Sequence, residues 1–168
     1  MSPNTIVLGH AGTALSPERT IYPPNSEKSI TYALDALNAD GVEVDIQLTK
    51  DSVLVLFHDD YMEDKSCISS HTWKEIQTMN ETEKHPILRL RTVLPFVLDR
   101  SRILMLDVKH YSFCNEDNVN YTTFNWALNN ELMLVSEEKK EKLMLVSRNA
   151  DLLQAISDDA IRLGYESN

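Results

Sequence analysis

The sequence predicts an α/β fold built around a largely parallel sheet, and three observations support this. Short runs rich in Val, Ile and Leu alternate with segments of helical periodicity along the chain. The runs are nearly continuously apolar, which is typical of parallel strands covered by helices. Ionisable residues stand at the ends of several runs, where folds of this class build their sites. A (β/α) barrel and a doubly wound sheet both fit this pattern.

The apolar runs predict six strands. They cover residues 5–10, 42–49, 53–59, 102–109, 142–147 and 161–167. The chain contains no glycine-rich phosphate loop of the GxGxxG or GxxxxGK[ST] kind. That absence disfavours a nucleotide-binding form of the doubly wound sheet.

Helices are expected between the strands. The first begins after an N-cap at Asn25 or Ser26 and ends before Gly41, with apolar residues at helical spacing between them. Further helices are predicted at 72–79, 91–99, within 118–134 and at 149–157. The charged run at 136–142 predicts a solvated surface loop.

Composition limits the class of protein. A chain of 168 residues with 42% hydrophobic content is expected to form a single domain over residues 1–168. The formal net charge of -10 argues against binding to nucleic acid. No apolar run approaches the roughly 20 residues of a transmembrane helix, and the N-terminus shows no signal-peptide pattern, which leaves the compartment open. Cys67 and Cys114 form no CxxC pair and are expected to be reduced thiols or small core residues.

Two carboxylates interrupt the second strand pattern. Glu43 and Asp45 are two residues apart, so their side chains point to the same face of a strand. Like charges in a desolvated site need a cation, and a hard divalent ion such as Mg²⁺ or Ca²⁺ suits carboxylate oxygens. The alternative is a solvent-exposed strand face, on which such pairs are common.

Other polar residues stand at further strand ends. His10 closes the first predicted strand and His58 the third, while Asp107 and Lys109 share one face at the end of the fourth. In an α/β fold these ends converge, so we expect the four residues to meet Glu43 and Asp45. An exposed ion pair is the alternative interpretation for Asp107 and Lys109.

These residues lie in motifs that resemble the glycerophosphodiester phosphodiesterase family. That family has an H-R-G strand end, P-E-N-[ST], E-x-D-[VI]-x-x-[ST]-x-D, a strand ending in H-D, P-x-L, and a later E-[IL]-K. The corresponding segments here are His10-Ala11-Gly12, Pro23-Pro24-Asn25-Ser26, Glu43 to Asp51, Phe57-His58-Asp59, Pro86-Ile87-Leu88 and Asp107-Val108-Lys109. The resemblance runs from residue 5 to about 167 and is strongest from 41 to 60.

The resemblance implies a (β/α)8 TIM-barrel-like fold and a metal-dependent phosphoric diester hydrolase. Its substrate would be a small-molecule glycerophosphodiester, cleaved to sn-glycerol 3-phosphate and an alcohol. It further implies the roles of the site residues: Glu43, Asp45 and Asp107 hold Mg²⁺ or Ca²⁺, His10 and His58 are the catalytic acid and base, and Lys109 binds the substrate phosphate. Which histidine is the acid stays open.

Three positions depart from the family pattern. Ala11 replaces an arginine that could hold phosphate in a bidentate way, and Pro24 replaces a glutamate. Asp107 replaces a glutamate and matches the Asp-x-Lys of sphingomyelinase D-like phospholipases. Two alternatives to the diesterase therefore remain: a phospholipase of that kind, and a catalytically impaired, barrel-derived binding protein.

Length departs from the family fold as well. An eight-stranded barrel typically takes roughly 250 residues, whereas this chain has room for about six β/α units. The expected fold is thus a shortened barrel that either lacks its last two units at the C-terminus or closes in an unusual way, for example with a second copy. Open strand edges would allow such self-association into a homo-oligomer.

Overall fold

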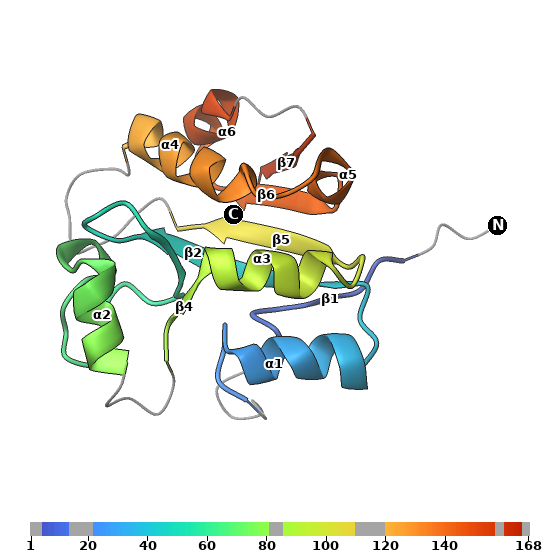
Figure 1. Cartoon of the computed structure of the whole chain (residues 1–168), viewed down its shortest axis with the longest axis horizontal. Helices are drawn as coiled ribbons and strands as arrows, with labels where there is room; N and C mark the ends of the chain where they lie inside the picture. Colours follow the sequence, from blue (N-terminus) through green and yellow to red (C-terminus); the bar gives the residue numbers. More distant parts are fainter. Residues whose placement is uncertain (1–4, 14–21, 81–85, 110–119, 157–159, 166–168) are drawn as a thin grey trace.

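The computed structural model describes residues 5–13, 22–80, 86–109, 120–156 and 160–165, and its sheet contains seven strands in that part of the chain. The strands are β1 (Leu8–Gly9), β2 (Gly41–Leu48), β3 (Leu54–Leu56), β4 (Leu88–Arg89), β5 (Ile103–Val108), β6 (Leu143–Ser147) and β7 (Arg162–Tyr165). Five of them, in the order β1-β2-β5-β6-β7, run parallel (Figure 1). The predicted α/β class and all six predicted strands are confirmed, and the two-residue β4 is an addition.

The third predicted strand is antiparallel. A tight turn at Thr49–Ser52 joins β2 to β3, with Ser52 in the left-handed region at φ 63° and the backbone N–H of Thr49 donating to Val53 O at 2.9 Å. Leu56 therefore pairs with Ile46 in an antiparallel ladder. The expectation that His58 closes a parallel strand is wrong. His58 instead follows the returning arm of a hairpin.

The predicted helices are confirmed with small shifts of their ends. They are α1 (Glu27–Thr31), which continues as a π-helical segment over Tyr32–Ala36, α2 (Trp73–Asn80), α3 (Leu90–Leu98), α4 (Tyr121–Leu132) and α6 (Ala150–Ala155). Ser26 is the N-cap of α1, since its hydroxyl accepts from the backbone N–H of Ser29 at 3.2 Å. The charged run predicted as a loop contains a short helix, α5 (Glu137–Lys140), none of whose residues is buried.

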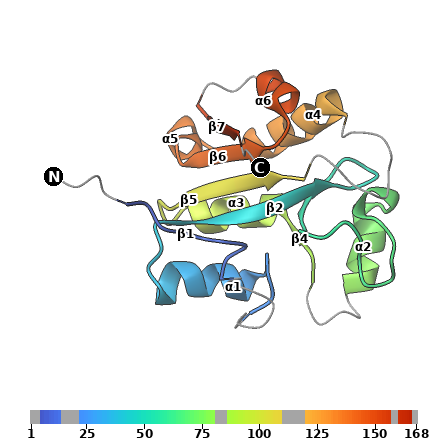
Figure 2. The same ribbon diagram turned by 180° about the vertical axis from the view of Figure 1, so that it is seen from behind.

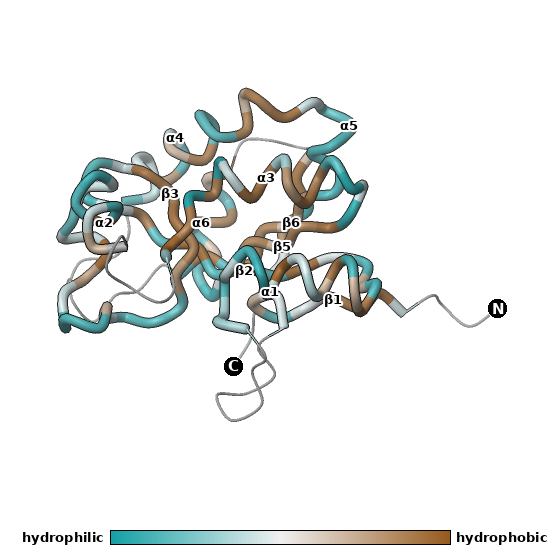
Figure 3. The backbone as a smooth tube through the Cα atoms, turned by 60° about the horizontal axis from the view of Figure 1, so that its bottom comes forward, coloured by the Kyte–Doolittle hydropathy of each residue, from teal (hydrophilic) through white to brown (hydrophobic). Residues whose placement is uncertain are grey.

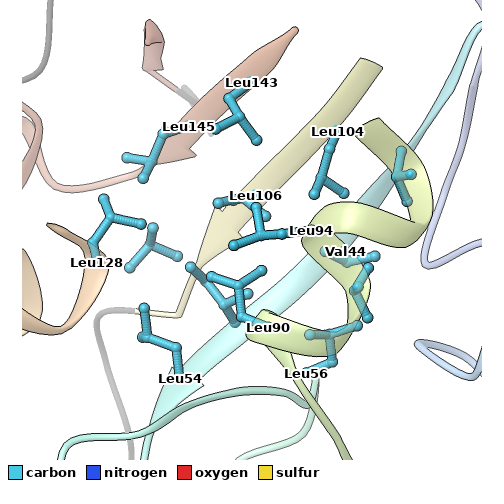
Figure 4. Close-up of a cluster of buried hydrophobic side chains, with 14 of the residues drawn as sticks. Val44, Leu54, Leu56, Leu90, Leu94, Leu104, Leu106, Leu128, Leu143 and Leu145 are labelled. Atoms are coloured by element: carbon cyan, nitrogen blue, oxygen red, sulfur yellow. The ribbon is translucent and has the colours of Figure 1, made fainter. Parts of the chain in front are cut away.

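The main core lies between one face of the sheet and the helices. The buried side chains of β2, β5 and β6, including Val44, Leu104, Leu106, Leu143 and Leu145, pack with Leu90 and Leu94 of α3 and Leu128 of α4 (Figure 4). Each such leucine stabilises the fold by about 1.5–3 kcal/mol relative to an exposed one. In Figure 3, β5 and β6 are largely brown, the colour of hydrophobic residues.

The opposite face of the sheet is polar near the carboxyl ends of its strands. Along β5, Leu104, Leu106 and Val108 are buried, whereas Ile103, Met105 and Asp107 are half-buried. In Figures 1 and 2, which view the molecule from opposite sides, α3 lies in front of β2 and β5 in one view and behind them in the other. Because α3 covers one face of β2 and β5, the alternate residues that point to the other face are the ones available to a site.

Cys67 is disulfide-bonded, so the expectation of a reduced thiol is wrong for this residue, and Cys114 lies outside the described residues. Among the described helices, none has both the length and the apolar character needed to cross a bilayer. Self-association through strand edges stays a prediction.

Candidate active site

Three carboxylates meet at the carboxyl ends of β2 and β5. The parallel register pairs Asp45 with Asp107, and Glu43 lies two residues before Asp45 on the same face of β2. One oxygen from each of the three lies within 4.8 Å of the others. Glu43 is 5% exposed and Asp45 is 1% exposed, so the exposed-strand alternative does not describe them. The structure brings these residues together as strand parity predicted.

The proton affinity of one carboxylate in this cluster, Glu43, is raised. Desolvation and the charge of Asp45 raise the pKa of Glu43 from 4.5 to about 7, against the opposing effects of a backbone hydrogen bond from Ala11 and of His10. A protonated carboxyl and a bound cation are two ways of relieving the same repulsion. This cluster is thus electrostatically suited to a divalent cation.

Lys109 supplies the nearest positive charge. Its Nζ lies 2.6 Å from Oδ2 of Asp107 and 2.8 Å from Oδ1 of Asp45. Partial burial by itself would lower the pKa of Lys109, but the hydrogen bond to Asp107 and the negative charges of both carboxylates outweigh it and raise that pKa. The exposed ion-pair interpretation is therefore wrong for Lys109 and Asp107, because the pair is half-buried and Lys109 also contacts a second, buried carboxylate, that of Asp45.

Asp45 is held from the other side by Asn25. The Asn25 Nδ2 donates to Oδ2 of Asp45 at 2.9 Å, and the Asn25 Oδ1 accepts from the Asp45 backbone N–H at 3.1 Å. The second oxygen, Oδ1, is buried and lies 2.8 Å from the Lys109 ammonium. A buried carboxylate oxygen beside two other carboxylates fits a metal ligand, and in this structure the Lys109 ammonium provides the positive charge next to it.

Glu43 is held by the loop that carries His10. The backbone N–H of Ala11 donates to Oε2 of Glu43 at 2.8 Å. Ala11 takes up a left-handed conformation at φ 44°, and Gly12 follows it at φ 87°. Residue 11 thus holds Glu43 through its backbone N–H, which any side chain at this position except that of proline would leave in place.

The two histidines lie on segments that are hydrogen-bonded to β2 or to its side chains. His10 is 69% exposed, and its Nε2 lies 3.8 Å from Oε2 of Glu43. His58 is 55% exposed, and its Nδ1 lies 2.8 Å from Oδ1 of Asp59. The hairpin brings His58 back toward β2, because the backbone N–H of Phe57 donates to Asp45 O at 3.1 Å. Their roles as acid and base stay a prediction.

Fold and site together define a barrel-like α/β protein with a candidate site for a divalent cation at its strand ends. The model of the glycerophosphoryl diester phosphodiesterase family matches residues 19–166. The chain belongs to this family.

Known relatives agree with that assignment. A glycerophosphodiester phosphodiesterase of Bacillus altitudinis is 32% identical over 95 residues, which cover 50% of this chain and 38% of the relative. The glycerophosphodiester phosphodiesterase of Thermotoga maritima superposes with a TM-score of 0.70 at 24% identity, covering 98% of this chain and 63% of that one. A phosphodiesterase of Oleispira antarctica, solved with the product sn-glycerol-3-phosphate, gives a TM-score of 0.74 at 20% identity and covers 96% and 65%.

These superpositions establish the fold. They confirm the predicted TIM-barrel-like architecture in shortened form, because nearly all of this chain matches less than two thirds of each of the two solved structures. Relative to the Bacillus relative, the matched part is less than half of that protein. The described residues contain five parallel strands, fewer than the eight of a complete barrel.

Proposed function

We propose that this protein is a metal-dependent phosphoric diester hydrolase that cleaves glycerophosphodiesters to sn-glycerol 3-phosphate and an alcohol. The observation that carries the proposal is the carboxylate triad of the buried Glu43 and Asp45 and the half-buried Asp107, which offers one oxygen from each residue within 4.8 Å of the others. Family membership supports the reaction class. The product held by the Oleispira relative supports the substrate class.

The triad would hold Mg²⁺ or Ca²⁺, both of which prefer oxygen ligands. When bound, such an ion acts as a Lewis acid on a phosphoryl oxygen and offsets charge that develops there. Lys109, already beside Asp45 and Asp107, would place its ammonium against a second phosphate oxygen. Together these groups neutralise an anionic substrate in a chain whose net charge is -10.

Two histidines would move the protons. Hydrolysis joins a water oxygen to phosphorus, breaks the bond from phosphorus to the alcohol oxygen, and transfers one proton to the departing alcohol. The Asp59 carboxylate next to Nδ1 of His58 favours the tautomer whose Nε2 can accept a proton, so His58 suits the base. His10, beside Glu43, suits the acid.

One observation favours a second candidate. Asp107 and Lys109 form the Asp-x-Lys pattern that resembles sphingomyelinase D-like phospholipases, with an aspartate as third carboxylate. Such an enzyme would act on a sphingolipid or lysophospholipid head group. Comparing glycerophosphocholine with lysophosphatidylcholine and sphingomyelin as substrates separates the two activities.

The deciding experiment measures glycerol 3-phosphate released from glycerophosphocholine, with Mg²⁺ or Ca²⁺ and then with EDTA. The proposal expects metal-dependent release that His58→Ala abolishes. His71→Ala is the matched control, since that histidine is bound to Ser66 at 2.9 Å and belongs to no part of the triad. Release that persists in EDTA or in His58→Ala contradicts the mechanism. Metal binding without turnover on any of the three substrates favours the binding-protein alternative.

A further inference from the structure

Asn25 links parts of the site that are far apart in the sequence. Its side chain makes two hydrogen bonds to Asp45, which lies twenty residues further along the chain. Its backbone N–H donates to the carbonyl of Ala11 at 2.9 Å. Ala11 in turn donates its own N–H to Glu43. The hydrogen bonds therefore run from Asp45 through Asn25 and Ala11 to Glu43, and β2 closes the ring.

Asn25 combines burial of a polar side chain with a left-handed backbone. It is 5% exposed and takes up a left-handed conformation at φ 57°. Asparagine tolerates this conformation better than other side chains, and a buried amide is retained only where its donors and acceptors are satisfied. The strained backbone is what lets the amide meet Asp45 in a two-point contact while the N–H faces Ala11.

We infer that Asn25 is a positioning residue that fixes the Asp45 carboxylate for metal binding and couples it to the loop carrying His10. By binding Oδ2 of Asp45, the amide fixes the rotation of the carboxylate, and Oδ1 then lies 2.8 Å from the Lys109 ammonium. Partners that orient a ligand in this way typically contribute 10- to 100-fold in metal affinity. The inference rests on the metal site of the proposed function.

The same ring explains how the site tolerates Ala11. The Ser29 hydroxyl also donates to the Ala11 carbonyl at 3.1 Å, and it accepts from the Thr13 N–H at 2.6 Å. The loop is thus held by α1 and by Asn25 through the backbone of Ala11 and through the backbone and hydroxyl of Thr13. A side chain at position 11 is not needed to keep Glu43 in place.

The test is calcium binding to the whole chain, measured by titration calorimetry, in wild type, Asn25→Gly and Asn38→Gly. Glycine keeps the left-handed backbone and removes only the amide. Asn38 is the matched control: it has φ 52°, and its side chain accepts from Arg102 at 2.6 Å, ahead of the amino end of β2. We expect a 10- to 100-fold loss of affinity in Asn25→Gly and less than a twofold change in Asn38→Gly. Urea unfolding in EDTA shows whether the two variants are equally stable.

A second variant keeps the test decisive if Asn25→Gly does not fold. Asn25→Ala removes the amide without adding a charge, and alanine already takes up a left-handed conformation in this chain at Ala11 (φ 44°), so we expect at least a tenfold weaker calcium affinity. Wild-type affinity in either folded variant overturns the positioning role. Failure of the wild type to bind Ca²⁺ or Mg²⁺ overturns the metal site itself, which distinguishes that failure from the first.

Discussion

Lys109 neutralises the most buried carboxylate of the protein's candidate site, with its Nζ 2.8 Å from Oδ1 of Asp45. Removing one partner of a buried pair leaves an uncompensated charge and typically costs 3–5 kcal/mol. Because Lys109 is partly exposed, we expect Lys109→Met to lower the free energy of unfolding by about 3 kcal/mol in EDTA. Adding Mg²⁺ or Ca²⁺ should recover part of that loss, since a bound cation replaces the missing charge.

Lys139→Met is the control for this prediction. Lys139 pairs with Asp99 at 2.6 Å on the surface, where ion pairs contribute at most about 1 kcal/mol. Urea unfolding with and without metal measures both variants. Equal losses in Lys109→Met and Lys139→Met would show that the Asp45 pair is not energetically special.

The raised pKa of Glu43 predicts a pH dependence of stability. A carboxyl whose pKa is raised from 4.5 to about 7 in the folded state binds its proton more tightly there than in the unfolded chain. Its contribution is fully present below pH 4.5 and is lost as the pH rises through 7. The loss amounts to about 3 kcal/mol in metal-free protein. Glu43→Gln should flatten this part of the curve, and an unchanged difference between wild type and variant across pH 4–8 would contradict it.

Metal affinity should also depend on the protonation of Glu43, but it should rise with pH, whereas the contribution of Glu43 to stability falls. A cation competes with the proton on Glu43, so binding should weaken below about pH 7 and should release protons. Calorimetry in buffers of different ionisation enthalpy counts the protons released. Binding at pH 7 with no proton release would mean that Glu43 is already ionised in the metal-free protein.

Gly12 should tolerate no side chain. An added Cβ would lie 2.3 Å from the Ser29 hydroxyl and 2.7 Å from a Ser29 backbone atom, and φ is 87°. Strain of this kind combined with overpacking costs roughly 2–5 kcal/mol. We expect Gly12→Ala to destabilise the protein accordingly. Gly164→Ala, which places a Cβ 3.0 Å from Val146 without a positive φ, should cost less in the same urea experiment.

Asp51 joins the β2–β3 hairpin to α2. Its Oδ1 accepts from the Thr49 hydroxyl at 2.7 Å and from the backbone N–H of Trp73, the first residue of α2, at 2.9 Å. Asp51→Ala removes a helix cap, so we expect a loss of about 1 kcal/mol. Thermal unfolding measures it. Retained stability would show that water replaces the carboxylate at no cost.

The convergence of the triad was predictable because it depends on strand parity. Glu43 and Asp45 must share a face of β2, and the parallel register with β5 brings Asp107 beside Asp45. The direction of β3 depends on a different signal, the length of the connection. An apolar run has the same pattern in a parallel and an antiparallel strand, but only residues 50–52 separate the two predicted strands, whereas a parallel connection needs a dozen or more residues.

The sequence places Asn25 at a candidate helix cap and in the segment that resembles P-E-N-[ST], but neither pattern predicts its contact with Asp45. Ser26 caps α1, whereas Asn25 uses its side chain on a strand twenty residues away. No local pattern distinguishes these two uses of a polar residue before a helix. The disulfide of Cys67 was missed for a similar reason, because pairing depends on distances in the fold that cysteine spacing does not contain.

The hairpin also bears on the order in which the site assembles during folding. Gln47 Nε2 donates to Phe57 O across a separation of ten residues, so the segment bearing Asp45 and His58 can form from local contacts. Asp107 joins it only after a much longer stretch of chain has been closed, at a larger entropic cost. We expect one half of the candidate site to be formed before the strand that completes it arrives.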